Sequence, residues 1–273
     1  MRAYCSKKSK INFSQNKNRQ GYRSGSQGSL KIVGTGPGDI GHLSQRAREA
    51  IKECQVIFGY KTYINLLGNL VDNKEVKSFG MMEEVKRAKR AIEDAKKGRR
   101  VCIVSSGDSG VYGMAGLVLE LLKKSGLNEL RVEIIPGIIA ATSCAALLGA
   151  PLTHDFAAIS LSDLLTDLNL IKRRIELAAA ADFVIVLYNP KSAKRVTPFK
   201  EACRILLKHK SPSTPVGIVE NAYRDKQRVS LTTLSKLSSF EKINMVTTII
   251  IGNSKTYIKD KFMITPRGYN LCS

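Results

Sequence analysis

LKIVGTGPGD, residues 30–39, joins a short apolar run to a glycine-rich turn. The run has the length and composition of a buried β-strand, and the residues that follow Ser44 have helical spacing, with Ser44 in place to cap that helix. A strand that leads through a tight turn into a helix is the repeating unit of α/β proteins. Because glycine has no Cβ atom, such a turn also lets backbone groups approach a ligand or a neighbouring strand.

The same alternation continues through the first half of the chain. We predict strands at 30–33, 55–58, 100–104 and 131–135, and helices at 44–54, 83–97, 111–124 and 139–148. Alternating strands and helices indicate a mostly parallel sheet that is covered on both faces.

The second half of the chain has a different pattern. We predict helices at 164–180 and 193–208 and strands at 183–187, 216–220, 227–231 and 245–251. The close spacing of the last strands indicates an antiparallel portion, and hence a mixed sheet. The sequence therefore predicts two α/β lobes, residues 29–140 and 141–270, with a ligand cleft between them.

The charge of the chain is strongly positive. It has 44 Lys and Arg against 23 Asp and Glu, a net charge of +21. Residues 1–28 contain seven of the basic side chains, no acidic one and no apolar periodicity, so we expect a disordered basic arm there. The rest of the chain is also basic and should attract a polyanion: a nucleic acid, a phosphate or a polycarboxylate.

The cysteines and the apolar runs bear on where the protein works. The six cysteines include no C-x-x-C pair, which is typical of reduced thiols and not of disulfides or a metal site. No apolar run is long enough to cross a bilayer, and no apolar signal segment follows Met1. We therefore expect a cytoplasmic protein without a metal and without a membrane partner.

Five short motifs follow predicted strands and are the candidate ligand turns. They are GTGPGD (34–39), SSGDSGVYG (105–113), IPGIIAAT (135–142), LYNP (187–190) and VENA (219–222). Each also has a structural interpretation: Asp108 could cap the next helix, and the small residues after Gly137 could serve close packing. None of the motifs identifies a function by itself.

In this order, and together with PLTHDF (151–156), the motifs resemble the tetrapyrrole methylase family, the class III methyltransferases. The resemblance covers about residues 30–270. Within the family, FGYKTY (58–63), SFGM (78–81) and GMAG (113–116) are most similar to the C17-methyltransferases that act on precorrin-3B or cobalt-precorrin-3. This resemblance implies a protein of two α/β lobes that forms a homodimer. It also implies S-adenosylmethionine-dependent methylation of a corrin precursor, with ring contraction, in cobalamin biosynthesis.

Three alternatives stay open at this point. The chain could be another precorrin methyltransferase, a class III methyltransferase that acts on RNA or protein, or a binding module in which the ligand turns are relics. The positive charge would suit RNA. However, the chain has no Trp and few aromatic residues, and the carboxylates of a tetrapyrrole explain a basic cleft equally well.

The resemblance also assigns roles to individual residues. The cofactor-binding set that it implies is Pro37, Ser106, Gly107, Asp108, Val111, Ile139, Ala140, Tyr188, Asn189 and Ala222. It places Gly34, Gly36 and Asp39 in the loop that faces the macrocycle. As cations that could hold substrate carboxylates at the rim of the cleft, we expect Lys61, Lys191, Lys194, Arg195 and Arg224.

The acid–base pair that uroporphyrinogen-type relatives are thought to use does not transfer to this chain. The position of its Asp is Tyr60, and the position of its Lys falls near Gly80 or Met81. The local catalytic candidates are therefore Tyr60, Lys61 and His154, with Tyr63 and Asp155 beside them. Histidine is the natural proton carrier near neutral pH, although His154 could instead only hold the segment between the lobes.

Overall fold

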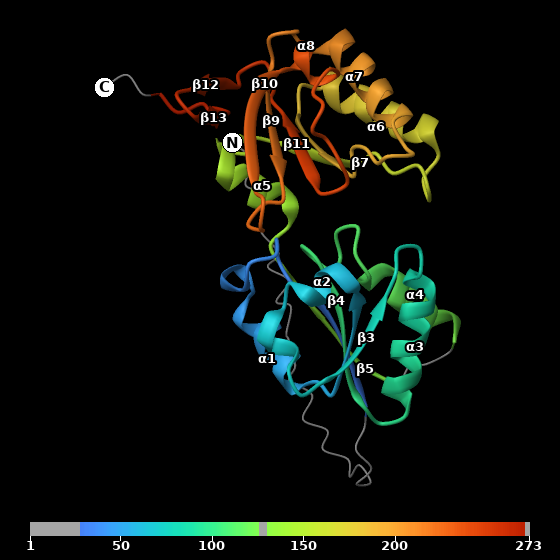
Figure 1. The fold of residues 1–273 in the computed structure, drawn as a ribbon. Helices are drawn as coiled ribbons and strands as arrows, with labels where there is room; N and C mark the ends of the chain where they lie inside the picture. The colour runs from blue at the N-terminus through green and yellow to red at the C-terminus, as the bar shows by residue number, and fades with distance from the viewer. Residues whose placement is uncertain (1–27, 126–129, 271–273) are drawn as a thin grey trace, which may run out of the picture.

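The computed structural model describes residues 28–125 and 130–270. The predicted basic arm, residues 1–28, lies outside these ranges except for its last residue. Two five-stranded sheets and one three-stranded sheet form the framework, and helices cover both faces of the two larger sheets (Figure 1). No helix in the described ranges combines the length and the apolar composition that crossing a membrane requires.

The first sheet is parallel throughout, with the strand order β3-β2-β4-β1-β5. Its strands are β1 (Ser29–Gly34), β2 (Val56–Tyr60), β3 (Glu75–Phe79), β4 (Arg100–Ser105) and β5 (Arg131–Ile135). Its helices are α1 (Gln45–Glu53), α2 (Lys61–Asn65), α3 (Glu84–Lys96) and α4 (Ala115–Lys124), with the short 3-10 helices η1 (Ile40–His42) and η2 (Gly68–Val71). The side chains of β4 point alternately to the two faces of the sheet. Val101 and Ile103 pack with α3 and α4 on one face. Cys102 and Val104 pack with α1 on the other face.

The second sheet is mixed, with the order β10-β9-β11-β8-β7, and only β7 and β8 are parallel in it. Its strands are β7 (Phe156–Ser160), β8 (Val184–Tyr188), β9 (Pro215–Glu220), β10 (Arg228–Thr233) and β11 (Thr247–Ile251). On one face lie α6 (Leu168–Ala180), α7 (Thr197–His209) and α8 (Leu234–Leu237), and on the other lies α5 (Ala140–Leu148). The predicted fold class, with a parallel sheet first and a mixed sheet second, is confirmed.

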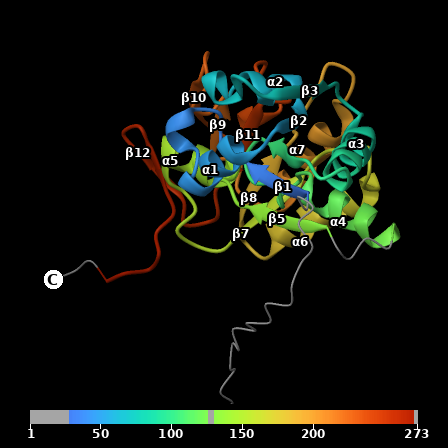
Figure 2. The same ribbon diagram turned by 90° about the horizontal axis from the view of Figure 1, so that it is seen from below.

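A small third sheet extends the second half of the chain. It has the order β12-β13-β6, and its strands are β12 (Tyr257–Lys259), β13 (Phe262–Ile264) and β6 (Gly149–Ala150). Because β6 directly follows α5, the third sheet joins the end of the chain to the region just after the first lobe. Figure 2 shows β12 at the side of the molecule that lies away from α3 and α4.

Three predicted helix starts are wrong. Helix α4 begins at Ala115 and not at 111, because residues 106–114 form a glycine-rich loop in which Tyr112 has a φ of 54°. Helix α6 begins at Leu168 and not at 164, because Asp167 caps it, accepting hydrogen bonds from the amides of Asn169 and Leu170. Helix α7 begins at Thr197 and not at 193, with a proline in its first turn.

Strands β3 and β7 are present where the sequence predicted none. Both are edge strands of their sheets. In β3 only Phe79 is buried, and β7 contains small residues and one buried Ile159, so neither has the continuous apolar run of a central strand. The signal of an edge strand is weak in a sequence because one side of the strand faces solvent or another chain segment.

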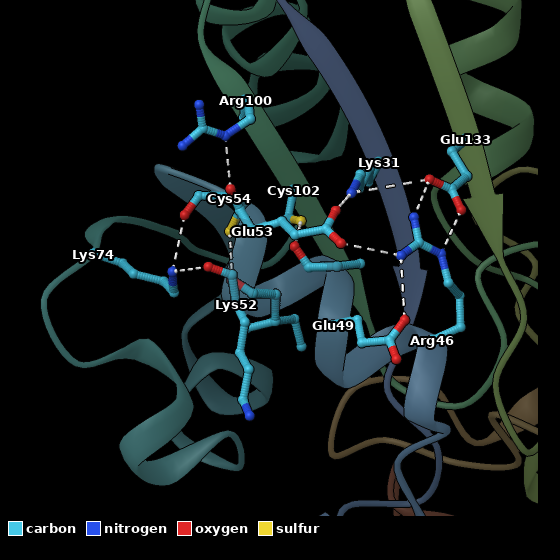
Figure 3. Close-up of polar contacts among 12 residues, drawn as sticks. Lys31, Arg46, Glu49, Lys52, Glu53, Cys54, Lys74, Arg100, Cys102 and Glu133 are labelled. Atoms are coloured by element: carbon cyan, nitrogen blue, oxygen red, sulfur yellow. Dashed lines mark hydrogen bonds and ion pairs between the residues drawn. The ribbon is translucent and has the colours of Figure 1, made fainter.

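A cluster of charged side chains fixes α1 against β1 and β5 (Figure 3). Arg46 of α1 forms a bidentate pair with Glu133 of β5, with N···O distances of 2.7 and 2.6 Å. Lys31 of β1 pairs with Glu53 at the end of α1. The bidentate guanidinium lowers the pKa of the Glu133 carboxyl below its usual value. The cluster sets the position of the two strands whose following turns reach the site.

Two glycines, Gly34 and Gly137, allow the turns after β1, β4 and β5 to touch. A Cβ atom on Gly137 would lie 2.2 Å from the carbonyl oxygen of Gly107 and 2.7 Å from the carbonyl carbon of Gly34. A Cβ atom on Gly34 would in turn lie 2.6 Å from the amide nitrogen of Gly137. Real Cβ atoms do not approach backbone this closely, so only glycine fits where these turns cross.

We expect Gly137→Ala to destabilise the protein by about 1–3 kcal/mol, because the backbone of three turns must move apart to admit one methyl group. Thermal unfolding of the purified variant measures this. Gly116→Ala is the matched control: Gly116 is exposed on α4 and a Cβ atom there meets nothing within 4 Å. Since alanine favours a helix over glycine, the control should keep or gain up to about 1 kcal/mol. An unchanged melting temperature for Gly137→Ala would contradict this account.

Candidate active site

The site is a cavity of about 350 Å³ where the turns of the first sheet face those of the second. All ten residues predicted to bind the cofactor line it: Pro37, Ser106, Gly107, Asp108, Val111, Ile139, Ala140, Tyr188, Asn189 and Ala222. They come from the turns after β1, β4, β5, β8 and β9. A cavity of this size at strand ends suits a small molecule.

Asp108 is held by the turns around it. Its Oδ1 accepts a hydrogen bond from the amide of Gly110 at 2.7 Å, and its Oδ2 accepts one from the amide of Gly137 at 2.9 Å. The carboxylate therefore links the turn after β4 to the turn after β5. Each oxygen keeps a second lone pair that can face a ligand in the cavity. It does not cap α4, which begins at Ala115.

The wall contributed by the second sheet is fixed by hydrogen bonds of two tyrosines. The Tyr188 hydroxyl accepts a hydrogen bond from the amide of Ala141 at 2.9 Å, and burial raises the pKa of Tyr188 to about 12. The Tyr112 hydroxyl donates to the carbonyl of Ala158 at 3.0 Å and accepts from the amide of Ser160 at 3.2 Å. Tyr112 thus connects the loop after β4 to the edge strand of the second sheet.

Arg224 connects the two halves of the chain in the opposite direction, from the loop after β9 to the turns of the first sheet. Its Nη2 donates to the Oγ of Ser106 at 2.6 Å, and its Nε donates to the carbonyl of Pro37. No carboxylate in the described ranges forms an ion pair with it. Burial lowers the pKa of Arg224 from its usual value, but an arginine stays charged at physiological pH. The cavity therefore contains a cation that is hydrogen-bonded but not neutralised.

Of the predicted rim cations, only Arg224 lines this cavity. Arg195 donates to the carbonyls of Leu161 and Asn189, and therefore holds the loop after β8. Lys191 has its ammonium 5.9 Å from the centre of the Phe199 ring. Lys61 and Lys194 are not among the lining residues.

The predicted catalytic candidates separate into two places. Tyr60 lines the cavity together with Thr62 and Tyr63, whereas Lys61 is exposed and lies outside the lining. The rings of Tyr60 and Tyr63 meet edge to face, with centroids 5.2 Å apart. His154 instead lines a different cavity, of about 450 Å³.

The position of His154 follows from the direction of β7. It lies two residues before the start of that strand, whereas Tyr188 is the last residue of the parallel neighbour β8 and Asn189 follows it. A five-residue strand spans roughly 15 Å, so His154 lies at the opposite edge of the sheet from the first cavity. It could act on a ligand there only after a large movement.

The three residues predicted for the macrocycle loop contact the turns around the cavity and do not line the cavity itself. Gly34 lies at the crossing of the three turns, and Gly36 forms a two-way backbone bridge with Gly107. Asp39 caps η1 through the amide of Gly41. None of the three is among the residues that line the cavity, and their contact with a substrate stays a prediction.

Several lining residues were not predicted: Thr62, Met81, Tyr112, Cys144, Asn221 and 245–248. Thr62, Met81, Tyr112 and Asn221 lie within motifs quoted above, but a motif by itself does not show where a side chain points. Cys144 stands in the small-residue helix α5, and burial raises the pKa of its thiol to about 11. Residues 245–248 approach the cavity only because β11 lies between β8 and β9.

A cavity at the carboxyl ends of parallel strands, bounded by glycine-rich turns and a second mixed sheet, defines an α/β enzyme that acts on a small molecule. Residues 29–238 match the family model for Tetrapyrrole (Corrin/Porphyrin) Methylases. The chain belongs to this family.

Individual relatives agree with the family match. The cobalt-factor III methyltransferase of Priestia megaterium is 53% identical over 246 residues, which are 89% of this chain and 45% of that longer protein. The probable cobalt-factor III C(17)-methyltransferase of Salmonella typhimurium is 47% identical over 242 residues, 89% of this chain and 100% of the relative. Among solved structures, the methyltransferase CobJ has a TM-score of 0.82 at 31% identity, covering 88% of this chain and 100% of its own.

We expect Asp108→Asn to weaken cofactor binding by about 1.5–3 kcal/mol, the usual loss for a hydrogen bond to a charged group. It should also lower the melting temperature, because an asparagine amide group can replace only one of the two oxygens that accept backbone amides. Calorimetry and thermal unfolding measure the two effects separately. Unchanged affinity with lowered stability would assign Asp108 to the turns alone.

Proposed function

We propose that this chain is an S-adenosylmethionine-dependent methyltransferase that methylates C17 of a corrin precursor in cobalamin biosynthesis, with contraction of the macrocycle. The observation that carries the proposal is that all ten predicted cofactor residues surround one cavity, in a chain of the tetrapyrrole methylase family. The Priestia and Salmonella relatives are both named for cobalt-factor III. This favours a cobalt-containing substrate over precorrin-3B.

The residues of the cavity fit such a cofactor. Val111 and Ile139 offer apolar surface for an adenine ring, and the backbone at the strand ends offers donors and acceptors for a ribose. Asp108 is the one carboxylate among the lining residues and suits the cationic part of the cofactor. S-adenosylmethionine supplies a methyl group on a sulfonium, so the protein mainly has to align the acceptor carbon with it.

The remaining wall suits a flat ring that carries carboxylates. Tyr60, Tyr63 and Met81 provide aromatic and apolar surface, and Arg224 provides a guanidinium without a carboxylate partner in the described ranges. Arginine is the natural receptor for a carboxylate because its donors match the two oxygens. A nucleic acid would require a broad basic surface, whereas Arg224 is the one Lys or Arg among the residues that line this cavity.

We further propose that the protein is a cytoplasmic homodimer. Tyr257 and Phe262 of the third sheet are 45% and 46% exposed, a surface that a second copy could cover. Cys54, Cys102, Cys144 and Cys203 are buried free thiols, as suits a reducing compartment. The boundary between the lobes at residue 140 also stays a proposal, supported by the packing of α5 on the second sheet.

The proposed function is tested by binding and by turnover. We expect calorimetry to give about one S-adenosylhomocysteine per chain. Incubation with methyl-labelled S-adenosylmethionine should then transfer label to cobalt-factor III but not to transfer RNA or to a protein extract. Folded protein that binds no cofactor would overturn the methyltransferase assignment, and label that enters only RNA or protein would overturn the substrate.

The charge of the site predicts a dependence on salt. Of the predicted rim cations only Arg224 lines the cavity, but the net charge of +21 over the chain should attract a polycarboxylate substrate, and ions should screen this attraction. We expect the KM for the macrocycle to rise markedly between low and physiological ionic strength. The dissociation constant of the cofactor, measured in the same buffers, is the control and should stay nearly constant. If the KM for the macrocycle does not change with ionic strength, shape and apolar contacts dominate substrate binding.

A further inference from the structure

The proposed reaction leaves the source of a proton unassigned. Besides Arg224, the titratable side chains that line the cavity are Asp108, Cys144 and the tyrosines 60, 63, 112 and 188. Asp108 accepts two backbone amides, and the hydroxyls of Tyr112 and Tyr188 are already hydrogen-bonded to backbone. Cys144 is hydrogen-bonded to Thr248. Tyr60 and Tyr63 remain, since neither hydroxyl forms a hydrogen bond with any residue that the structure describes.

Tyr63 differs from Tyr60 in the charges around it. Arg224, in the loop after β9, lines the same cavity, and Arg87 of α3 is near enough for its charge to act on the phenol. Both guanidiniums favour the ionised phenolate, whereas burial, Tyr60 and Glu84 of α3 disfavour it. Burial is the largest effect, so the pKa of Tyr63 lies above its usual value. At neutral pH the side chain is a protonated phenol in the wall of the cavity.

Arg87 is an unusual residue to find beside this phenol. It is only 4% exposed, and its Nε and Nη1 are buried with no hydrogen-bond partner in the described structure. Its Nη2 contacts the sulfur of Met114 at 3.3 Å, and the nearest carboxylate oxygen, on Glu84, is 3.8 Å away. Burying a guanidinium with so few partners is costly. A functional reason for burying the Arg87 guanidinium would be an effect of its charge on a neighbouring group such as the Tyr63 phenol.

We propose that Tyr63 is a catalytic proton donor to an oxygen of the macrocycle, and that Arg87 is a positioning residue that stabilises the phenolate left behind. This rests on the proposed function. In the step, the O–H bond of Tyr63 breaks as an O–H bond forms on a substrate oxygen that gains negative charge while the ring rearranges. One proton moves, no electron is exchanged with the protein, and solvent returns the proton to the phenolate. The positive charges of Arg224 and Arg87 both favour the phenolate.

The first test is Tyr63→Phe, which removes the hydroxyl and keeps the ring. With cobalt-factor III we expect kcat to fall about 100-fold or more, as general acid catalysis typically contributes, while the cofactor dissociation constant changes less than about twofold. Tyr269→Phe is the matched control, because Tyr269 is 78% exposed and outside the cavity; it should retain full activity. A kcat for Tyr63→Phe within threefold of the unaltered protein, or a larger loss in Tyr60→Phe, overturns the assignment.

The second test follows the ionisation of Tyr63 without turnover. Subtracting the ultraviolet tyrosinate titration of Tyr63→Phe from that of the unaltered protein isolates this phenol. When the same subtraction is made in the Arg87→Met background, the midpoint of the Tyr63 titration should move to higher pH, because a cation that favours the phenolate is gone. Arg87→Lys should return the midpoint to that of the unaltered protein. If Arg87→Met does not fold, Arg87→Lys compared with Arg87→Gln gives the same contrast. A titration that ignores residue 87 refutes the role of Arg87.

Failure of the proposed function can be distinguished from failure of the assignment of Tyr63. If the unaltered protein transfers no methyl group, the proposed function falls while the titration still reports the environment of Tyr63. If it methylates and Tyr63→Phe methylates equally well, only the assignment of Tyr63 falls. A high-pH decline in kcat that disappears in Tyr63→Phe would directly support a proton donor, because a donor is lost as pH rises through its pKa.

Discussion

The site depends on the close contact of three turns at Gly34, Gly107 and Gly137. These turns belong to the ends of β1, β4 and β5, in that order, and the three strands are neighbours in the parallel sheet, so their backbones lie side by side at one edge. With any side chain at Gly137 the turns would have to separate, and Asp108 would lose the amide that it accepts across the contact. Backbone contact without side chains therefore determines where the floor of the cavity lies.

The second sheet completes the cavity through contacts in both directions. Tyr112 extends from the first half of the chain to the backbone of β7, and Arg224 extends from the second half to Pro37 and Ser106. Each contact joins a side chain of one half to a fixed group of the other, and together they hold the two sets of turns at the separation of a small molecule. The site is thus a property of both halves and of neither alone.

Much of this could be predicted from the sequence because it depends on local pattern. Apolar runs, glycine-rich turns and helical spacing indicate the parallel sheet, and the motifs at strand ends indicate which turns share the cavity. The start of α4 and the edge strands β3 and β7 could not be predicted, because a glycine-rich loop and a half-exposed strand have weak signals. His154 was misleading for a related reason: its residue type suits proton transfer, but the direction of β7 places it at the other edge.

The charges of the site show most clearly what local pattern leaves out. Arg87, Tyr63 and Arg224 belong to α3, α2 and the loop after β9, and nothing in their spacing along the chain relates them. Folding brings two poorly neutralised guanidiniums to one phenol, and the free energy of burying them opposes folding. The proposed polycarboxylate substrate would offset part of this cost, because one of its carboxylates could pair with Arg224. If the proposed substrate binds here, an arrangement that opposes folding would favour binding, as expected of a site whose charges are arranged in advance for its ligand.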